Sequence, residues 1–496
     1  MAIINGRGRV GIRRPSAAAA PSIILDGLKL YLDAGNATSY AGTGTVWTDL
    51  SGNGNNGTLI NGPTFNGANG GSIVFDGSND YVDCGSSFAF GTGPFTISVW
   101  YKVTNNNTNY SIVWSSGGGS NGEGVLTANY SNAVANYYAS GFRITNSAAL
   151  VKNIWYNTVL VGNGGVNGSR NIKLYTNSNQ VGVTYTTNYI FSNGRFLIGA
   201  NSAAFAEVMR GNISNVQIYN RALSAAEIAQ NYNAMLSRFY PIVSDADAQS
   251  FVVAAGLTSS VQANAVNTLV ASLKSAGIWT KMKAIYPMVG GSAASHKFNL
   301  KDPRDLDAAF RLAFTAGWVH SSTGAKPNSI GTGDYANTFF TPNSLSSIHT
   351  SYYSRTNISV TSNQILFDAF QAGGAQTYQF YFDTNGNIYH DVFNTGGGRI
   401  NISFSSTNGF YIGSRLNLTS NKIYKNSNLI VSNSNGGGTL PTIPLYMAAA
   451  NTSGGAVVFS KLETAFASIG DGLTDTEASN LYTAVQAYQT TLGRQV

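Results

Sequence analysis

Lys173-Leu174-Tyr175-Thr176-Asn177-Ser178-Asn179 returns in this chain as Lys422-Ile423-Tyr424-Lys425-Asn426-Ser427-Asn428. Two further matches keep the same order and nearly the same offset, Leu223–Glu227 with Leu473–Glu477 and Ala200–Ser202 with Ala450–Thr452. An offset of about 250 residues indicates tandem domains, because the repeats of solenoids are far shorter. The sequence therefore predicts that one fold is used twice.

Short runs of alternating apolar and polar residues recur between turn-forming clusters. Such alternation, flanked by Gly and Asn, is typical of β-strands. Many strands with long connections predict a β-sandwich or jelly roll, so the expected fold class is all-β. In the first half the runs are Leu28–Leu32, Phe95–Trp100, Thr158–Val161, Asn171–Tyr175 and Val216–Tyr219.

The composition limits the kinds of function that are open. Only 10% of the 496 residues are charged, against about 25% in an average soluble protein, which predicts a neutral polar surface of the kind found on assemblies. A single cysteine, Cys84, permits neither an intrachain disulfide nor a thiolate zinc site. The chain has no apolar run long enough for a membrane span.

The first 25 residues form a basic arm, with no acidic residue before Asp26. Such an arm binds acidic protein surfaces or nucleic acid, and we expect a protein partner. A solvated disordered tail is the alternative. The Ala17–Ala20 run is too short for a signal peptide, so we expect assembly in the cytoplasm. The arginines of the arm are Arg7, Arg9, Arg13 and Arg14.

Residues 26–240 are predicted to form the first domain, closed by a short helix. Ser224 is a favourable N-cap and Glu227 follows three residues later, which completes a capping box. The second copy repeats this device with Thr474 and Glu477. We interpret both as helix starts and not as catalytic Ser/Glu pairs.

Residues 241–290 are predicted to form a helical insert. Asp245 can cap a helix over 246–255, and the apolar spacing from Val266 to Leu273 predicts a second helix that ends at Gly277. The insert leads into the second jelly roll, residues 291–496. Its role as a spacer, a packing element or an oligomer contact stays open.

Four segments of the first domain carry a resemblance to a known family: Trp47–Gly57, Val74–Val82, Phe95–Trp100 and Gly211–Ser224. In these segments the domain resembles the laminin-G-like jelly rolls of the concanavalin-A-like superfamily. The second domain shows only the later half of the pattern, with Gly333-Asp334-Tyr335 similar to Asn79-Asp80-Tyr81. The resemblance implies two tandem concanavalin-A-like sandwiches.

Such jelly rolls often hold calcium near the rim of a sheet. Carboxylates contribute to the six to eight oxygen ligands that calcium takes. The candidate calcium ligands are Asp76, Asn79, Asp80 and Asp83. The alternative to calcium binding is that Asp76 and Asp80 cap turns through Asx hydrogen bonds. In the second domain, Asp383–Asn387 is similar to the start of a calcium loop, but a hairpin turn explains it better.

The sequence offers little for catalysis. Glycosidases need two carboxylates beside the scissile bond, and related hydrolases place Glu-x-Asp-x-Glu on one strand. None of the five glutamates forms a Glu-x-Asp pair, and the four histidines have no metal spacing. We expect a chain that is not an enzyme and that has no cofactor besides, at most, calcium. For sugar binding, the candidate aromatic contacts are Tyr110, Trp114, Tyr130 and Tyr137.

The arm, two lectin-like domains and the closing Thr490–Arg494 stretch are similar in style to structural proteins of tailed bacteriophages. We expect a virion protein, as a capsid decoration, head fibre or tail appendage, that forms homo-oligomers and binds other virion proteins through its arm. Cell-surface glycans are further candidate partners, whereas membranes and nucleic acid are not expected. The alternative is a carbohydrate-binding adhesin or receptor-binding protein assisted by calcium. A degenerate glycan hydrolase or lyase is the third interpretation.

Overall fold

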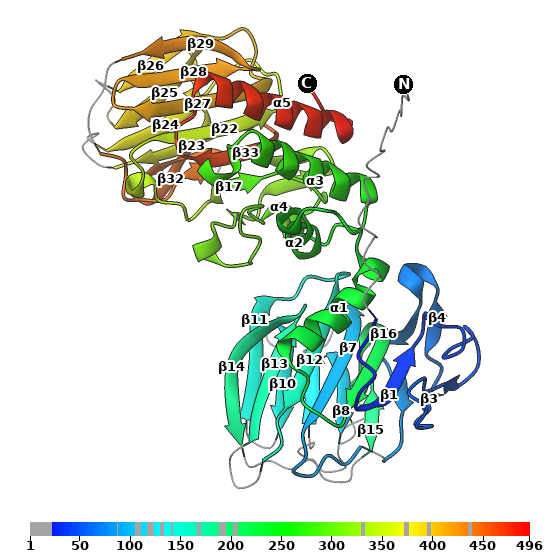
Figure 1. Cartoon of the computed structure of the whole chain (residues 1–496). Helices are drawn as coiled ribbons and strands as arrows, with labels where there is room; N and C mark the ends of the chain where they lie inside the picture. Colours follow the sequence, from blue (N-terminus) through cyan, green and yellow to red (C-terminus); the bar gives the residue numbers. More distant parts are fainter. Residues whose placement is uncertain are drawn as a thin grey trace, which may run out of the picture. The chain divides into compact units, whose positions relative to one another are not determined.

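The computed structural model describes residues 22–496 except 87, 105–110, 117–123, 129–132, 140–141, 166–169, 188–194, 202–206, 329–332, 372–375, 394–397 and 435–438. The chain divides into two compact units, each built mainly of two β-sheets with few helices (Figure 1). The first holds residues up to Ser147 and Tyr156–Ser237, and the second holds Ala148–Trp155 and Arg238–Val496.

One sheet of the first unit, sheet 1A, carries the closing helix. In spatial order its strands are β14 (Asn179–Thr187), β13 (Arg170–Thr176), β12 (Trp155–Gly162), β7 (Phe95–Val103), β16 (Arg210–Tyr219), β5 (Ser72–Asp76) and β4 (Thr64–Asn66), with β1 (Leu28–Asp33) also paired to β16. All five strands expected from alternation lie within these elements.

The opposing sheet of the first unit, sheet 1B, completes the sandwich. Its strands run in the order β11 (Phe142–Ala149), β10 (Ala133–Ala139), β9 (Gly124–Ala128), β8 (Ser111–Ser116), β15 (Phe196–Ile198), β6 (Tyr81–Asp83), β3 (Gly57–Ile60) and β2 (Val46–Trp47). A short 3-10 helix, η1 (Ala68–Gly70), follows β4.

Helix α1 (Ala225–Phe239) packs on sheet 1A. The ring of its Tyr232 stacks on Trp100 of β7, with ring centroids 5.2 Å apart. The predicted capping box is confirmed, because Glu227 N–H donates to Ser224 Oγ at 3.3 Å and Ser224 N–H donates to the Glu227 carboxylate at 2.8 Å.

The second unit repeats the two-sheet plan. Sheet 2A has the order β19 (Trp318–Ser321), β20 (Gly324–Pro327), β33 (Thr464–Gly470), β22 (Ile348–Ser354), β27 (Gly409–Asn417), β28 (Ser420–Lys425) and β29 (Asn428–Asn433), with β17 (Met282–Tyr286) paired to β33. Sheet 2B has the order β18 (Ala313–Phe314), β21 (Ala336–Asn337), β30 (Tyr446–Met447), β23 (Gln364–Phe370), β24 (Thr377–Phe382), β25 (Asn387–Phe393) and β26 (Arg399–Ser403), with β31 (Ala449–Thr452) also paired to β23 and β32 (Gly455–Phe459) paired to β31.

Three helices of the second unit pack on sheet 2A. Buried residues of all three share one apolar cluster with Tyr353, Phe410 and Phe466 of that sheet. Because β17 pairs with β33 as β1 pairs with β16, the second sandwich starts before residue 291, inside the segment expected to be a helical insert. The helices are α2 (Ala246–Ala254), α3 (Ser260–Ser275) and α5 (Asp475–Thr491); shorter ones are η3 (Trp279–Lys281), α4 (Ala293–His296), η4 (Asp307–Ala309) and η5 (Pro342–Ser344).

The repeated sequence forms the same hairpin in both units. Asn177-Ser178 joins β13 to β14, and Asn426-Ser427 joins β28 to β29. All four turn residues have positive φ, between 48° and 72°, which is the requirement of the two-residue type I′ turn that matches strand twist. The structure therefore confirms tandem concanavalin-A-like jelly rolls as the fold class.

Candidate functional site

Several predicted site residues lie outside the described part of the chain. These are Arg7, Arg9, Arg13 and Arg14 of the arm, and two of the four candidate glycan contacts, Tyr110 and Tyr130.

The other two candidate glycan contacts belong to the core of the first unit. Trp114 on β8 and Tyr137 on β10 are each 0% exposed. Their rings lie 6.0 Å apart, and Trp114 also stacks on Phe196 at 5.6 Å. The prediction is wrong for these two residues, because alternation along a strand does not say which face another layer will cover.

The predicted calcium ligands form turns. The Asp76 N–H donates to Asp80 Oδ2 at 3.0 Å, and the Ser78 N–H donates to Asp76 Oδ1 at 2.7 Å. The backbone carbonyl of Asn79 accepts from the Asn61 side chain at 2.9 Å. Burial, with the charge of Asp76, raises the pKa of Asp80. The bond from Ser78 to Asp76 is an Asx turn, as in the alternative interpretation, and Asp80 caps the same loop from its other end.

Asp83 points into an ion pair with Arg195, whose Nε donates to Oδ2 at 2.9 Å. Burial acts to raise the pKa of Asp83, but hydrogen bonds from Arg195 and the Gly85 N–H outweigh it and hold that pKa below its usual value. In the described ranges no group of three or more His, Cys, Asp or Glu residues is placed to hold a metal ion. The three candidate carboxylates are thus engaged by protein partners, and calcium binding stays a prediction from sequence.

A polar row that the sequence did not predict crosses sheet 2B. Asp368, Gln379, Asp391 and Arg399 come from four neighbouring strands and are successive cross-strand partners. Their side chains lie on the face away from the core, because the alternating residues Tyr378, Phe380, Ile388 and Ile400 belong to the core cluster between the sheets. The row thus contains two carboxylates, Asp368 and Asp391, which lie on different strands and belong to no common sequence motif.

Both carboxylates of the row are engaged by neighbours. Asp368 accepts from Gln379 Nε2 at 2.6 Å and from the Asn451 N–H at 3.1 Å. Asp391 accepts from Arg399 Nε at 2.8 Å and from Nη2 at 2.6 Å. Each aspartate is 0% exposed, and burial raises the pKa of Asp368 to about 8. A glycosidase pair must reach its substrate, which this covered pair does not.

The region of the Asp383–Asn387 motif is a hairpin turn, as the sequence indicated. Asp383 Oδ1 accepts from the N–H groups of Asn385 at 3.0 Å and Asn387 at 2.8 Å. Gly386 has a φ of 82°. The turn joins β24 to β25.

Three of the four histidines, His296, His349 and His390, are buried in the second unit, and His320 is half-buried. His349 contacts the Asp471 carbonyl at 2.6 Å, and His390 contacts Asn421 Oδ1 at 2.7 Å. Burial lowers the pKa of His349 to about 4. His296 and His320 meet through their Nδ1 atoms at 3.0 Å.

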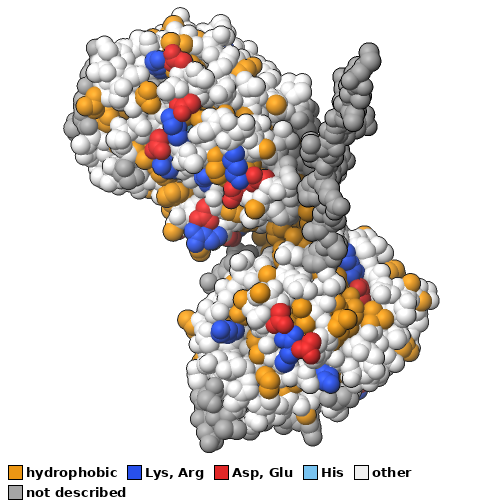
Figure 2. Space-filling view, viewed as in Figure 1, with side chains coloured by type: hydrophobic (Ala, Val, Ile, Leu, Met, Phe, Trp, Pro, Cys, Tyr) orange, Lys and Arg blue, Asp and Glu red, His pale blue; other side chains and the backbone are white. Residues whose placement is uncertain are grey.

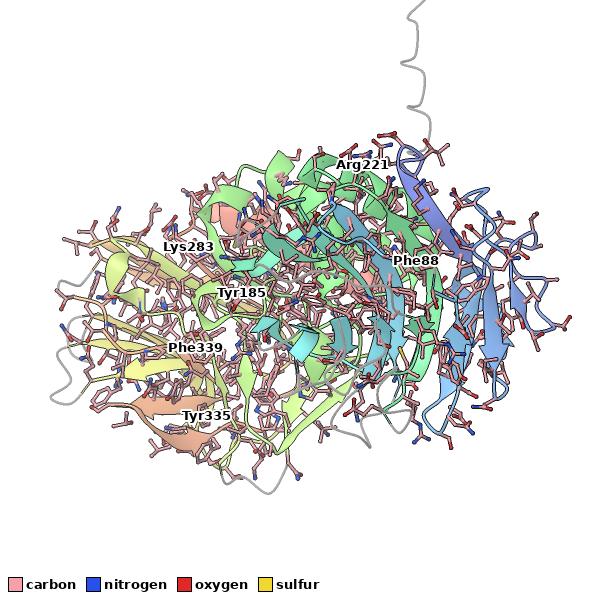
Figure 3. All side chains as sticks on the ribbon, turned by 90° about the horizontal axis from the view of Figure 1, so that it is seen from below. Phe88, Tyr185, Arg221, Lys283, Tyr335 and Phe339 are labelled. Carbon is pink, nitrogen blue, oxygen red and sulfur yellow. The ribbon has the colours of Figure 1, made fainter. Side chains whose placement is uncertain are left out.

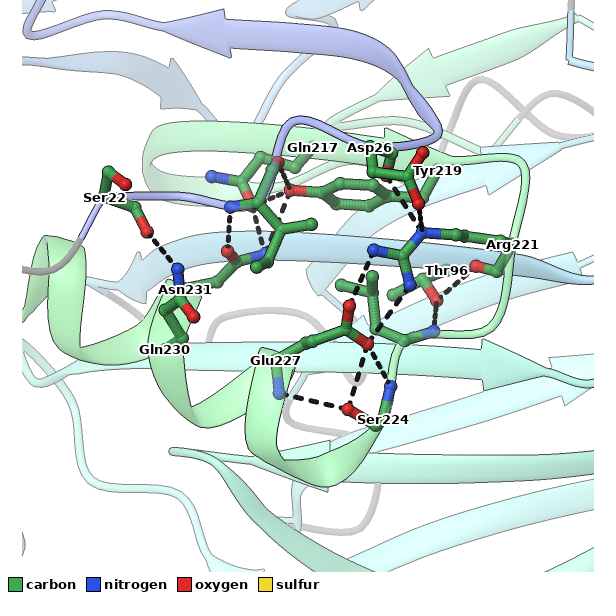
Figure 4. Close-up of polar contacts among 12 residues, drawn as sticks. Ser22, Asp26, Thr96, Gln217, Tyr219, Arg221, Ser224, Glu227, Gln230 and Asn231 are labelled. Atoms are coloured by element: carbon green, nitrogen blue, oxygen red, sulfur yellow. Dashed lines mark hydrogen bonds and ion pairs between the residues drawn. The ribbon is translucent and has the colours of Figure 1, made fainter.

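Residues 22–26, which we call the arm root, connect the basic arm to the first unit (Figure 4). The Ile24 N–H donates to Asn231 Oδ1 at 2.7 Å, and Tyr219 OH donates to the Ile24 carbonyl at 2.9 Å. Gln230 Nε2 donates to the Ser22 carbonyl at 2.8 Å. Asn231 and Gln230 lie on α1, so residues 22–24 are hydrogen-bonded to that helix.

Arg221 contacts Asp26, the last residue of the arm root, and lies on the outside of the first unit (Figure 3). Its Nε donates to the Asp26 carbonyl at 3.0 Å, while its two terminal nitrogens bind Glu227. The arm root and the start of α1 therefore share one network. On the face that Figure 2 shows, the described surface is largely uncharged, with acidic and basic side chains in small groups.

Residues 76–229 match the family model described as the concanavalin A-like lectin/glucanases superfamily. The first unit therefore contains a concanavalin A-like, lectin-like domain. No curated protein matches the chain.

Similar solved structures include Trypanosoma rangeli sialidase, at 15% identity and a TM-score of 0.35, over 45% of this chain and 34% of the sialidase chain. This chain thus covers about a third of that enzyme's length. Domain 4 of AbnA, a GH43 extracellular arabinanase from Geobacillus stearothermophilus, in complex with arabinotriose, is 15% identical with a TM-score of 0.32, over 41% of this chain and 98% of that domain.

The binding domain of Paraclostridial Mosquitocidal Protein 1 is 12% identical, with a TM-score of 0.32, over 81% of this chain and 76% of that one. At these identities and scores the three similarities do not bear on function. Among the described residues, no helix is long and apolar enough to cross a membrane.

Proposed function

We propose that this chain is a non-enzymatic structural protein of a bacteriophage virion, where it serves as a capsid decoration, head fibre or tail appendage. Its basic arm binds another virion protein, and its two concanavalin A-like domains are displayed on the particle. The observation that carries the proposal is the arm root, which fastens the C-terminal end of the arm to α1 and to Tyr219.

Because the arm root is hydrogen-bonded to the first unit, binding of a partner to the arm would anchor that unit. A partner that binds the four arginines of the arm would hold the first unit in place, because residues 22–26 are hydrogen-bonded to its closing helix. Arginine recognises carboxylates through two parallel hydrogen bonds, so an acidic groove on a virion protein fits the arm. Several copies on one particle would add avidity to weak contacts of the displayed domains.

The non-enzymatic part of the proposal is supported by how the carboxylates are used. Glu227 and Glu477 belong to helix capping boxes. Asp391 is paired with Arg399, and Glu463 binds Thr323 and Arg355. Asp368 is covered and accepts two hydrogen bonds. A general acid or base needs direct access to the reacting group.

The test is incorporation into particles. Phage would be propagated with the full chain, a chain without residues 1–21, or a chain in which the four arm arginines are alanine. The truncation keeps residues 22–26, so the network on α1 is preserved. We expect the full chain in purified particles and both altered chains only in the soluble fraction, with unchanged melting temperatures.

Two results would contradict this proposal. Incorporation of the truncated chain at the level of the full chain would remove the anchoring role. Absence of the full chain from purified particles would remove the virion role altogether.

The second candidate function is a carbohydrate-binding adhesin or receptor-binding protein. It is favoured by the match of residues 76–229 to a model described as lectin/glucanase. Calcium assistance belongs to this candidate as a proposal only. The two candidates are compatible, since a virion protein can display a glycan-binding domain.

A further inference from the structure

A cavity opens beside β4 at the edge of the first unit. Its volume is about 400 Å³, and Tyr40 and Phe65 are its only large side chains. Phe65 lies on β4, where all three residues are exposed, and is itself 37% exposed. Because this aromatic ring is exposed and lines the cavity, one of its faces can contact a ligand.

The ring of Phe65 is held in position from one side. Tyr40 is 5% exposed, and its ring lies 5.7 Å from that of Phe65 at an angle of 48°. Its hydroxyl donates to the Gly44 carbonyl at 2.9 Å. Tyr40 is therefore a fixed support, and it is Phe65 that faces the open space.

Glycines keep the cavity open. A Cβ atom at Gly42 would lie 3.4 Å from the Phe65 ring, and one at Gly67 would lie 3.7 Å from it. Gly71 has a φ of 107°, and a Cβ there would lie 2.5 Å from the Ala34 carbonyl oxygen. Side chains at these positions would cover the ring or collide with the wall.

The lining also defines the chemistry of the ligand. It contains no charged side chain, and the remaining wall residues are glycine and alanine. Hydrogen-bonding groups of the walls are therefore those of the peptide backbone, together with the Tyr40 hydroxyl. A ligand that suits this site is uncharged, with one apolar face for Phe65 and polar groups around its edge.

We propose that the cavity beside Phe65 binds a neutral pyranose sugar, with the C–H face of the sugar stacked on the ring. The volume lies within the range of small-molecule sites and exceeds that of one sugar ring. No carboxylate contributes to the site, so binding needs no calcium. This inference rests on the carbohydrate binding proposed above and gives it a position distinct from Asp76 and Asp80.

The experiment measures binding of neutral methyl glycosides of glucose, galactose, mannose and N-acetylglucosamine to the full chain by ligand-observed NMR, with and without EDTA. Phe65→Ala removes the stacking face. Gly67→Leu leaves Phe65 in place but covers it, and the φ of −75° at Gly67 suits any residue. Phe65→Trp keeps a stacking face. Val183→Ala, at a residue 73% exposed outside the cavity, is the matched control.

We expect at least one glycoside to bind equally well with EDTA. Affinity should fall about tenfold or more in Phe65→Ala and Gly67→Leu, since aromatic stacking contributes on this scale. It should be kept in Phe65→Trp and Val183→Ala. Melting temperatures would confirm that all variants are folded.

Two outcomes overturn the proposal in different ways. If a glycoside binds but Phe65→Ala and Gly67→Leu bind as the unaltered chain does, or if EDTA abolishes binding, the site lies elsewhere and the carbohydrate-binding function stands. If no glycoside binds, this inference and the adhesin candidate both fail, while the particle experiment still decides the anchoring role.

Discussion

Arg221 and Glu227 form a two-point ion pair at the start of α1. Arg221 Nη2 donates to Glu227 Oε1 at 2.7 Å, and Nη1 donates to Oε2 at 3.1 Å. In the second unit, Lys281 pairs with Glu477 at 2.6 Å in the corresponding place. In each unit a basic residue thus binds the carboxylate of the capping box. Arg221 comes from the segment just before α1, whereas Lys281 directly precedes β17.

Glu227→Ala should destabilise the first unit. The change removes the hydrogen bond to the Ser224 N–H and the partner of Arg221, so we expect a loss of about 1–2 kcal/mol. Urea unfolding of the full chain, followed by tryptophan fluorescence, would measure it. Glu227→Gln is the matched control and should lose less, because its amide oxygen can still accept. Equal stability of the alanine variant would contradict the structural role of the pair.

The same carboxylate predicts a pH dependence. Hydrogen bonds from Arg221 lower the pKa of Glu227 from 4.5 to about 2. Because the folded-state pKa is below the unfolded one, the stabilisation is present above pH 4.5 and is lost as the pH falls toward 2. The stability difference between the original chain and Glu227→Gln should therefore shrink over this window. A difference that stays constant from pH 6 to pH 2.5 would exclude the linkage.

Asp368→Asn should stabilise the second unit at neutral and alkaline pH. Burial raises the pKa of Asp368 from 3.8 to about 8, so the folded state loses stability as the pH rises through that interval. Asparagine cannot ionise, and Gln379 can turn its amide to keep a hydrogen bond. Melting temperatures from pH 4 to pH 9 should show a growing advantage of the variant. An advantage that is flat with pH would mean that Asp368 does not titrate in this range.

Arg399→Ala should cost more than Asp391→Asn. Removing the guanidinium leaves the 0%-exposed Asp391 without its cation, and breaking such a pair from one side costs about 3 kcal/mol. The double variant Asp391→Asn with Arg399→Ala should recover part of the loss, because no buried charge remains. Unfolding free energies of the three variants form a double-mutant cycle. Additive losses would show that the two residues do not interact.

Asn231→Ala should loosen the arm root without unfolding the first unit. Its side chain accepts from the Ile24 N–H and donates to Tyr219 OH at 3.0 Å. We expect faster amide exchange at Ile24 and faster proteolysis before Leu28, with little change at α1. Gln230→Ala, which loses only the bond to Ser22, should have a smaller effect. Unchanged exchange at Ile24 would mean that the root is held by other contacts.

The sequence by itself determined the repeated fold and its local devices. Strands such as β7 and β13, the capping boxes at Ser224 and Thr474, and the shared Asn-Ser turns follow from residues within a few positions of one another. Side-chain alternation, helix capping and turn conformation are all short-range properties. For the same reason the matching segments of both copies could be aligned without a structure.

Only the tertiary structure decided which residues meet and which are covered. Asp368, Gln379, Asp391 and Arg399 lie on four strands, and strand register alone places them in one row. Trp114 is buried while Phe65 is left open, although both are aromatic residues on β-strands, β8 and β4. A shift of one residue in pairing exchanges the two faces of a strand. Burial and long-range partners therefore depend on the register and on the layers that pack on each sheet.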